Sequence, residues 1–189
     1  MNRRRFLCRA ATVASATLIP WHVHAQGKGE ISAKDVQALQ ENWRSLLAVG
    51  TSIPSPAEPL KLPAEAWRKR LPADAYRVLR TEGTKRPGTS ALNAEKRAGV
   101  FVCAGCDLPL FTSAMKYESG TGWPSFFTSI PGAFETKKDF LLGYPRVEYH
   151  CRRCGGHHGH LFDDGPPPTR ERWCNNGVAL RFLPKEAKA

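Results

Sequence analysis

The first regular pattern of apolar positions lies between residues 32 and 48. Apolar side chains recur there at spacings of three and four, at Val36, Leu39, Trp43 and Leu46. This spacing places them on one face of an amphipathic helix. Ser32 is a typical N-cap residue, and Gly50 is a typical residue just beyond a helix end. The pattern therefore predicts a helix that begins at Ser32 and ends near Ala48.

A proline-rich stretch separates this helix from the remainder of the chain. Residues 51–63 contain Pro54, Pro56, Pro59 and Pro63. Because proline lacks a backbone donor and biases its predecessor toward extended geometry, we expect a linker on the surface. Short helical patterns follow at residues 64–70 and 73–80. After Gly99 the pattern changes to short apolar runs between glycines and prolines, which is typical of β structure.

The first 25 residues have the layout of a secretory signal peptide. A basic start is followed by an apolar or small-residue run over residues 10–21 and by a small residue, Ala25. The run is shorter than the roughly 20 residues of a membrane-spanning helix. The Arg-Arg-x-Phe-Leu sequence at residues 3–7 resembles a twin-arginine export signal. We expect cleavage after Ala25 and export to a bacterial periplasm; the alternative is an uncleaved basic arm.

Composition and charge narrow the function classes. The 189 residues are 41% hydrophobic and 24% charged, which excludes a mainly disordered or membrane-spanning protein. The formal charge is +11, and removal of the four arginines in residues 1–25 leaves 11 − 4 = +7. The remaining cations are scattered and are not interleaved with aromatic residues. We therefore expect no nucleic-acid partner, and no stable membrane insertion after cleavage.

Two C-x-x-C pairs give the strongest chemical signal. Cys103 and Cys106 are followed, after 44 intervening residues, by Cys151 and Cys154. Two such turns supply four thiolates for a tetrahedral Zn²⁺ ion, and a closed site of this kind is structural. We call these four residues the cysteine clamp and expect one zinc ion per chain. The alternative is disulfide bonding, which export to an oxidising compartment favours.

Cys174 is the one cysteine after residue 25 that lies outside the clamp. Arg172 precedes it, Asn175 and Asn176 follow it, and the fold can bring histidines from residues 157, 158 and 160. A nearby cation or hydrogen-bond donor lowers a thiol pKa and enlarges the reactive thiolate fraction. Cys174 is therefore the candidate nucleophile. The alternative is a buried, inert core cysteine.

Several motifs surround these cysteines. They are Gly-Thr-Lys-Arg-Pro at residues 83–87, Gly-Thr-Gly-Trp-Pro-Ser-Phe at residues 120–126, and the segments 157–168 and 172–182. Together with the clamp spacing they resemble the type B methionine sulfoxide reductases, which reduce the R epimer of methionine sulfoxide. The resemblance runs from about Trp67 to Pro184.

The resemblance and the β pattern together imply a mainly β fold. We expect two small antiparallel sheets packed face to face in a β-tent-like arrangement, with short N-terminal helices and the zinc-binding clamp away from the active site. The expected organisation is a signal peptide over residues 1–25, a helical extension and linker over residues 26–63, and a reductase domain over residues 64–189.

The resemblance also implies roles for individual residues. Cys174 would attack the sulfoxide sulfur, form a cysteine sulfenic acid and release methionine. His160 would donate a proton or polarise the oxygen, and His157 matches the first histidine of the same motif. Trp123 would form a wall for the S-methyl group. Asn176 would hold a histidine or the sulfoxide oxygen through its amide.

The chain departs from the family pattern in several places. Leu142 stands where the family usually has a histidine, and residues 91–93 stand where many members have a further cysteine. No resolving thiol is visible, so an external thiol, such as a thioredoxin-like donor, is the expected reductant. His158 occupies a usually apolar position and is expected on the surface. On a regular strand, His157 and His160 would point to opposite faces.

The same residues are also compatible with functions other than methionine sulfoxide reduction. One is a zinc-stabilised binding module, and another is a catalytically degenerate member of the family. A hydrolase with an open metal site is disfavoured, because His157 and His160 have no carboxylate at a suitable sequence spacing.

Overall fold

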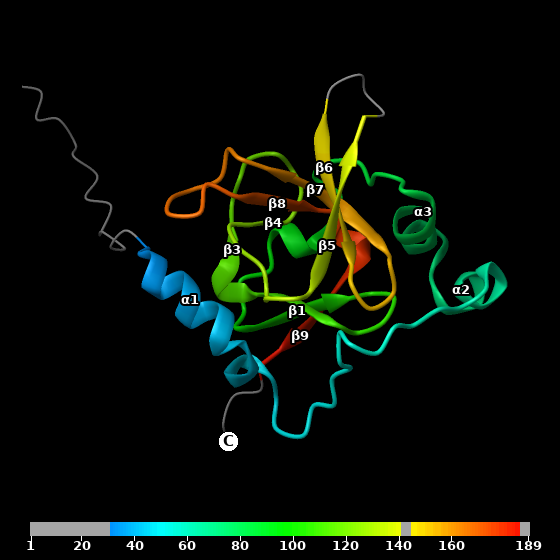
Figure 1. Cartoon of the computed structure of the whole chain (residues 1–189), viewed down its shortest axis with the longest axis horizontal. Coiled ribbons are helices and arrows are strands. Elements are labelled where there is room, and N and C mark those ends of the chain that lie inside the picture. Colours follow the sequence, from blue (N-terminus) through cyan, green and yellow to red (C-terminus); the bar gives the residue numbers. More distant parts are fainter. Residues whose placement is uncertain (1–30, 141–144, 186–189) are drawn as a thin grey trace, which may run out of the picture.

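The computed structural model describes residues 31–140 and 145–185 (Figure 1). The expected signal peptide and Leu142 lie outside these residues. With 3₁₀ helices written η, the elements are α1 (Ala33–Glu41), η1 (Trp43–Leu46), α2 (Ala64–Arg70), α3 (Ala73–Thr81), η2 (Ala91–Asn93), β1 (Gly99–Cys103), β2 (Pro109–Thr112), η3 (Ser113–Met115), β3 (Lys116–Tyr117), β4 (Ser125–Phe126), β5 (Phe134–Asp139), β6 (Arg146–Cys151), β7 (His157–Phe162), β8 (Arg172–Asn175), η4 (Gly177–Ala179) and β9 (Leu180–Pro184). In the described part of the chain, no helix has the length and apolar character needed to cross a bilayer.

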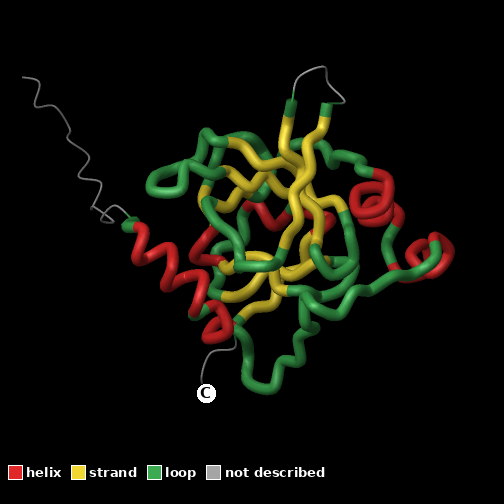
Figure 2. The backbone as a smooth tube through the Cα atoms, in the orientation of Figure 1, coloured by secondary structure: helices red, strands yellow, loops and turns green. Residues whose placement is uncertain are grey.

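The strands form two antiparallel sheets. The smaller has the order β2-β1-β9, and the larger has the order β3-β4-β8-β7-β6-β5. The strands occupy the centre of the molecule, and α1, α2 and α3 lie around them (Figure 2). The prediction of a mainly β fold with two antiparallel sheets and short N-terminal helices is confirmed.

Aromatic side chains from both sheets form the core. Phe126 of β4 meets Phe101 of β1 edge to face, with ring centroids 5.1 Å apart, and stacks on Phe111 of β2 at 3.9 Å. Trp173 of β8 stacks on Phe134 of β5 at 5.3 Å. Such pairs add stabilisation beyond the apolar area they bury. They fix β8, which carries Cys174, against the rest of the core.

The N-terminal helix begins where the sequence predicts and ends earlier. Ser32 and Asp35 form a capping box at the start of α1. The helix ends at Glu41 instead of near Ala48, and η1 follows. The side-chain amide of Asn42 donates to the Ala38 carbonyl at 3.0 Å. This local bond competes with continued helix and accounts for the early end.

The proline-rich linker, residues 51–63, forms no helix or strand, yet it is anchored to the domain. Its Leu60 backbone N–H donates to the Arg153 carbonyl at 2.7 Å. The side chains of Ile53, Leu60 and Leu62 pack against the core. The helical patterns after the linker match α2 and α3, and the second helix extends one residue further, to Thr81.

Candidate active site and cysteine clamp

The cysteine clamp joins the turn after β1 to the turn after β6. All four thiols are free, buried and within 4.8 Å of one another. Sγ of Cys103 lies 3.7 Å from Sγ of Cys154, and Sγ of Cys106 lies 3.5 Å from Sγ of Cys151. Sulfurs about 2.3 Å from a tetrahedral ion would lie about 3.8 Å apart. The four sulfurs therefore fit one metal ion, and the disulfide alternative is not what the structure contains.

A row of polar side chains crosses one face of the larger sheet. Cys174 of β8 pairs with Ser125 of β4 on one side and with His160 of β7 on the other. The row continues through Glu148 of β6 to Lys137 of β5. Residues directly opposite in antiparallel strands share a face. The register therefore brings the candidate nucleophile and the candidate proton donor together.

Cys174 opens into a small pocket of about 140 Å³. The lining residues are Thr84, Trp123, Arg146, Gly159, His160, Phe162, Cys174, Asn175 and Asn176. The pocket thus holds all the predicted catalytic and substrate-binding residues except His157. No clamp cysteine lines it.

The charge environment of Cys174 has two opposing parts. Burial raises the pKa of the thiol, and the Arg172 guanidinium acts in the other direction. Asp164 holds that guanidinium by two hydrogen bonds of 2.7 and 2.9 Å. The ring of Phe162 lies under it, 4.1 Å from the guanidinium carbon. Because burial dominates, the thiol is mostly protonated at neutral pH in the free protein.

This balance predicts how Cys174 reacts with iodoacetamide as pH is changed. The thiolate is the reacting form and predominates above the pKa of the thiol. The half-point, which is the pH at which the alkylation rate reaches half its maximum, should therefore lie above that of an ordinary cysteine, because burial raises the pKa of Cys174. Arg172→Gln should move it further up, and Asp164→Asn should move it down, because they remove charges of opposite sign. The rate at Cys174 is measured by mass spectrometry. A half-point below the ordinary value would contradict this prediction.

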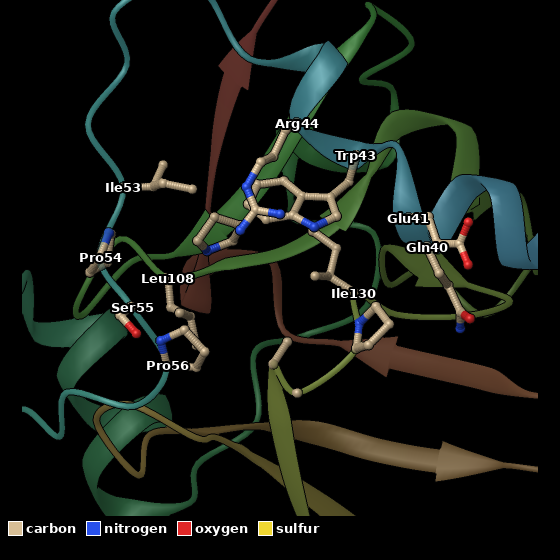
Figure 3. Close-up of a pocket in the computed structure, with 14 residues that line it drawn as sticks. Gln40, Glu41, Trp43, Arg44, Ile53, Pro54, Ser55, Pro56, Leu108 and Ile130 are labelled. Atoms are coloured by element: carbon tan, nitrogen blue, oxygen red, sulfur yellow. The ribbon is translucent and has the colours of Figure 1, made fainter.

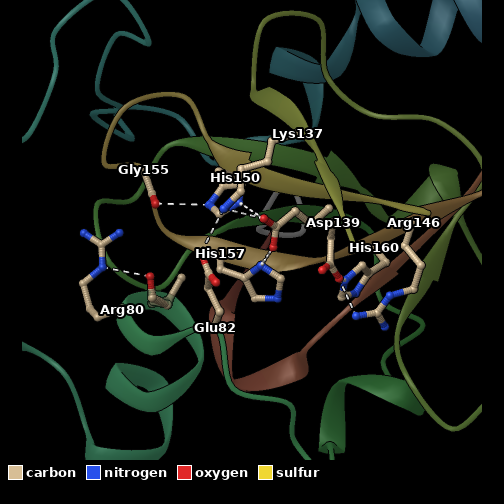
Figure 4. A network of polar contacts seen from close by, with 11 residues as sticks. Arg80, Glu82, Lys137, Asp139, Arg146, His150, Gly155, His157 and His160 are labelled. Atoms are coloured by element: carbon tan, nitrogen blue, oxygen red, sulfur yellow. Dashed lines mark hydrogen bonds and ion pairs between the residues drawn. The ribbon is translucent and has the colours of Figure 1, made fainter. Parts of the chain in front are cut away.

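His160 is held by a carboxylate from a neighbouring strand. Its Nε2 lies 3.0 Å from Oδ2 of Asp139, which also pairs with Arg146 (Figure 4). Burial lowers the pKa of His160, and the Asp139 hydrogen bond opposes that shift. The imidazole is therefore oriented and mostly neutral near pH 7.

A β-bulge changes where the other two histidines point. Tyr149 pairs with Gly159 and His150 pairs with His157, so His158 is an extra residue without a partner on β6. His158 points into the core, with 0% of its surface exposed, and packs edge to face on Phe134. The expectation of a surface side chain is wrong for this reason.

The bulge also returns His157 to the face that carries His160. The two ring centroids are 5.5 Å apart, so the expectation of opposite faces is wrong. Nδ1 of His157 lies 3.2 Å from Oε2 of Glu148, and burial lowers the pKa of His157 to about 4. Both histidines thus have carboxylate partners, Glu148 and Asp139, that come from other strands.

Asn176 and Trp123 are joined through one backbone segment. The Lys85 N–H donates to Oδ1 of Asn176 at 2.8 Å, and the Lys85 carbonyl accepts from Nε1 of Trp123 at 2.9 Å. Nδ2 of Asn176 donates to the His158 carbonyl at 3.0 Å. The amide of Asn176 is therefore used on backbone groups, and it positions the indole at the pocket wall.

Gly159 allows the close approach of β7 to β8. A Cβ built at this position would lie 2.0 Å from the backbone oxygen of Cys174. Any side chain here would push the two strands apart. The glycine therefore maintains the register that sets His160 beside Cys174.

Several residues of the site lack a clear sequence signal. Asp139, Arg146 and Glu148 reach the histidines only through strand pairing, and their spacing along the chain does not reveal it. Asp164 carries the signal of a turn, and its ion pair with Arg172 depends on the fold.

A larger pocket, of about 560 Å³, lies between η1, the linker and the turn before β2 (Figure 3). Trp43, Ile53, Leu108 and Ile130 contribute to its lining, which contains no cysteine or histidine. It has none of the reactive groups that surround Cys174, so the smaller pocket is the candidate active site.

Comparison with known proteins agrees with this choice. The family model described as the SelR domain matches residues 71–184, which contain the clamp and the whole lining of the Cys174 pocket. The chain belongs to the SelR domain family. The match covers the two sheets and leaves α1, η1, the linker and α2 outside.

Several peptide methionine sulfoxide reductases are similar to this chain. A peptide methionine sulfoxide reductase MsrB of Pseudomonas putida (strain W619) is 48% identical over 123 residues, 65% of this chain and 92% of that protein. One of Leifsonia xyli subsp. xyli is 47% identical over 124 residues, 65% of this chain and 89% of that protein. The chloroplastic peptide methionine sulfoxide reductase B2 of Arabidopsis thaliana is 42% identical over 142 residues, 74% of this chain and 68% of that protein.

Proposed function

We propose that this SelR-family chain reduces the R epimer of methionine sulfoxide in oxidised proteins, with Cys174 as nucleophile. The peptide methionine sulfoxide reductase activity rests on family membership and on relatives of that name. The role of Cys174 and the selectivity for the R epimer rest on one observation. Cys174 of β8 pairs with His160 of β7 in a pocket that Trp123 lines.

The chemistry begins at the Cys174 thiolate. Its sulfur attacks the sulfoxide sulfur, the S=O bond breaks, and the oxygen is transferred to Cys174 as a sulfenic acid. The methionine thioether is released, so the cysteine is oxidised by two electrons and the substrate is reduced by two. Arg172 supports this step, because its positive charge favours the thiolate.

His160 donates a proton to the sulfoxide oxygen as negative charge develops on that oxygen, or polarises it. A histidine can give or take a proton near neutral pH, and the Asp139 hydrogen bond opposes the lowering of its pKa by burial. His157 lies behind His160, near Glu148, and does not line the pocket. We therefore assign His157 a positioning role.

Trp123 gives the pocket its selectivity for one epimer. An aromatic face packs well on a methyl group and poorly on the polar S=O group. The Lys85 carbonyl fixes the indole, and Asn176 fixes Lys85. The S-methyl group would therefore lie against Trp123 while the oxygen faces His160.

The clamp holds a structural Zn²⁺ ion in this proposal. Four thiolates in a tetrahedral arrangement suit zinc, and a fully coordinated ion has no open position for substrate. The described cysteines outside the clamp comprise Cys174 alone, so no resolving thiol is available there. An external thiol, such as a thioredoxin-like donor, would attack the sulfenic acid, release water and form a mixed disulfide that a second thiol resolves.

Export to the periplasm is a further part of the proposal. It rests on the sequence of residues 1–25 alone. Fractionation of a bacterial host that expresses the full chain would test it, with Arg3 and Arg4 replaced by lysine as the matched control.

The function is tested with separated R and S epimers of methionine sulfoxide in a peptide and dithiothreitol as reductant. We expect turnover of the R epimer and no appreciable turnover of the S epimer. Equal rates, or preference for the S epimer, would contradict the assignment of Trp123 as the wall for the methyl group.

His160→Ala should slow turnover of the R epimer by roughly 10²–10⁴-fold, the usual contribution of a general acid or base. The loss should appear in kcat, since His160 acts on the oxygen during the reaction. Alkylation of Cys174 by iodoacetamide is the control, and it should continue in this variant. A loss smaller than about tenfold would place proton transfer on another group.

A further inference from the structure

A second cluster of metal-ligating side chains lies on β6 and β7, outside the cysteine clamp. Glu148 and His150 share one face of β6, because they are two residues apart, and His150 pairs with His157 of β7. The carboxylate and the two imidazoles offer ligand atoms that all lie within 4.8 Å of one another. The bulge at His158 creates this arrangement by turning His157 to the same face.

The Glu148 carboxylate lies about as far from each imidazole as two ligands of one tetrahedral ion lie from each other, and each imidazole faces a different carboxylate oxygen. Oε2 of Glu148 lies 3.2 Å from Nδ1 of His157, and Oε1 lies 3.4 Å from Nε2 of His150. Ligands that are about 2.0–2.1 Å from a tetrahedral Zn²⁺ ion lie about 3.4 Å from each other. Figure 4 shows the rings of His150 and His157 close together on the same side of the strands.

Three of the four imidazole nitrogens of this cluster lack a hydrogen bond. Among the described residues, both ring nitrogens of His157 and Nε2 of His150 are buried without a hydrogen-bond partner of good geometry. His157 is only 2% exposed, so water does not compensate well. Nδ1 of His150 faces the Gly155 carbonyl at 3.4 Å, which turns Nε2 toward Glu148. A backbone carbonyl orients metal-binding histidines in the same way.

A pocket lies beside the cluster. His150, His157 and Glu82 line a pocket of about 310 Å³. The ammonium of Lys137 lies 2.6 Å from Oε1 of Glu148 and 3.2 Å from Glu82, and the Lys137 side chain is 57% exposed. A positive charge is therefore already favoured beside Glu148. An exposed lysine can move away when another cation binds.

We propose that Glu148, His150 and His157 form a second metal site, which binds a divalent transition-metal ion such as Zn²⁺. Two imidazoles and one carboxylate are a common ligand set for such ions. The fourth position would face the pocket and take water. This site is separate from the clamp, and its test measures binding and does not depend on the proposed enzymatic activity.

In the experiment, Zn²⁺ is titrated into the full chain with its clamp metal already bound, and binding is measured by isothermal titration calorimetry. Every protein in this experiment also carries the Cys174→Ser substitution, so that the free thiol cannot bind the added metal. We expect one further ion per chain. His150→Gln and Glu148→Gln should each weaken binding of this ion by at least about tenfold. Loss of a residue that only hydrogen-bonds to a metal ligand already lowers metal affinity by about that factor. Lys137→Gln should tighten binding, because it removes the competing ammonium.

His160→Gln is the matched control, since it removes the neighbouring imidazole that is outside the cluster, and it should leave the affinity unchanged. Clamp metal content and circular dichroism confirm that each variant is folded. With Co²⁺ as the probe, the additional ion should give visible d–d bands without a thiolate charge-transfer band. The proposal is overturned by the absence of a saturable further ion, by equal weakening in the His160→Gln variant, or by a charge-transfer band from the additional ion.

Discussion

Cys174→Ser should lower reduction of the R epimer by roughly 10⁴-fold or more, the scale for loss of a catalytic nucleophile. A hydroxyl group has a much higher pKa than a thiol and is a poor nucleophile toward sulfur. The side chain is only partly exposed on β8, and serine is close to cysteine in size, so the fold should be retained. Turnover with dithiothreitol measures the loss. Retained turnover in this variant would exclude the mechanism.

A single-turnover experiment separates loss of chemistry from loss of recycling. Reduced protein treated with excess R-epimer substrate and no reductant should release about one methionine per chain and gain one dimedone-reactive sulfur at Cys174. Neither product should form in Cys174→Ser. A disulfide between Cys174 and a clamp cysteine, with metal released, would contradict both the external-thiol step and the structural role of the clamp.

Local features of the sequence predict the start of α1 and the two helices after the linker. Ser32 and Asp35 cap α1 through bonds within one turn, which sequence patterns capture well. The end of α1 was not predicted, because the apolar spacing continues through Trp43 and Leu46 although Asn42 ends the helix. Trp43 and Leu46 on η1 still pack on the core, although the backbone there is a 3₁₀ helix and not an α-helix.

The site shows the same division between local and non-local information. Two C-x-x-C turns identify the clamp, because each turn is local and supplies two cysteines at a spacing that suits a metal ion. The side of the sheet that each histidine faces depends on the bulge at His158, and alternation along one strand cannot reveal an extra residue. The carboxylates of Asp139 and Glu148 depend on pairing across three strands.

The extension before the SelR match shares in the core although the family model does not include it. Trp43 is buried in the same hydrophobic core as β1, and the linker bonds to Arg153, next to clamp residue Cys154. Arg153 also donates to the Cys106 carbonyl at 3.0 Å. The linker thus bonds to a residue that connects the two clamp turns, so the extension and the clamp contribute to one packed unit.

Cys106→Ser should cost the protein most of its stability. Binding of a structural Zn²⁺ ion contributes on the order of 10–16 kcal/mol, which is comparable to or larger than the total stability of about 5–15 kcal/mol of a typical domain. A serine hydroxyl is a poor zinc ligand, and the other three sulfurs would remain buried without the ion that balances their charge. We expect metal loss and a thermal unfolding midpoint many degrees lower, or insoluble protein.

Cys174→Ser is the matched control for this variant, because it makes the same chemical change outside the clamp. It should retain about one metal ion per chain and the unfolding midpoint of the unchanged protein. Metal analysis and thermal unfolding of both variants give the comparison. The clamp turns lie at the ends of β1 and β6, and β6 carries Glu148 beside His157. Loss of the ion should therefore release the strand that supports the histidines of the site, and a Cys106→Ser protein with an unchanged midpoint would contradict a structural role for the metal.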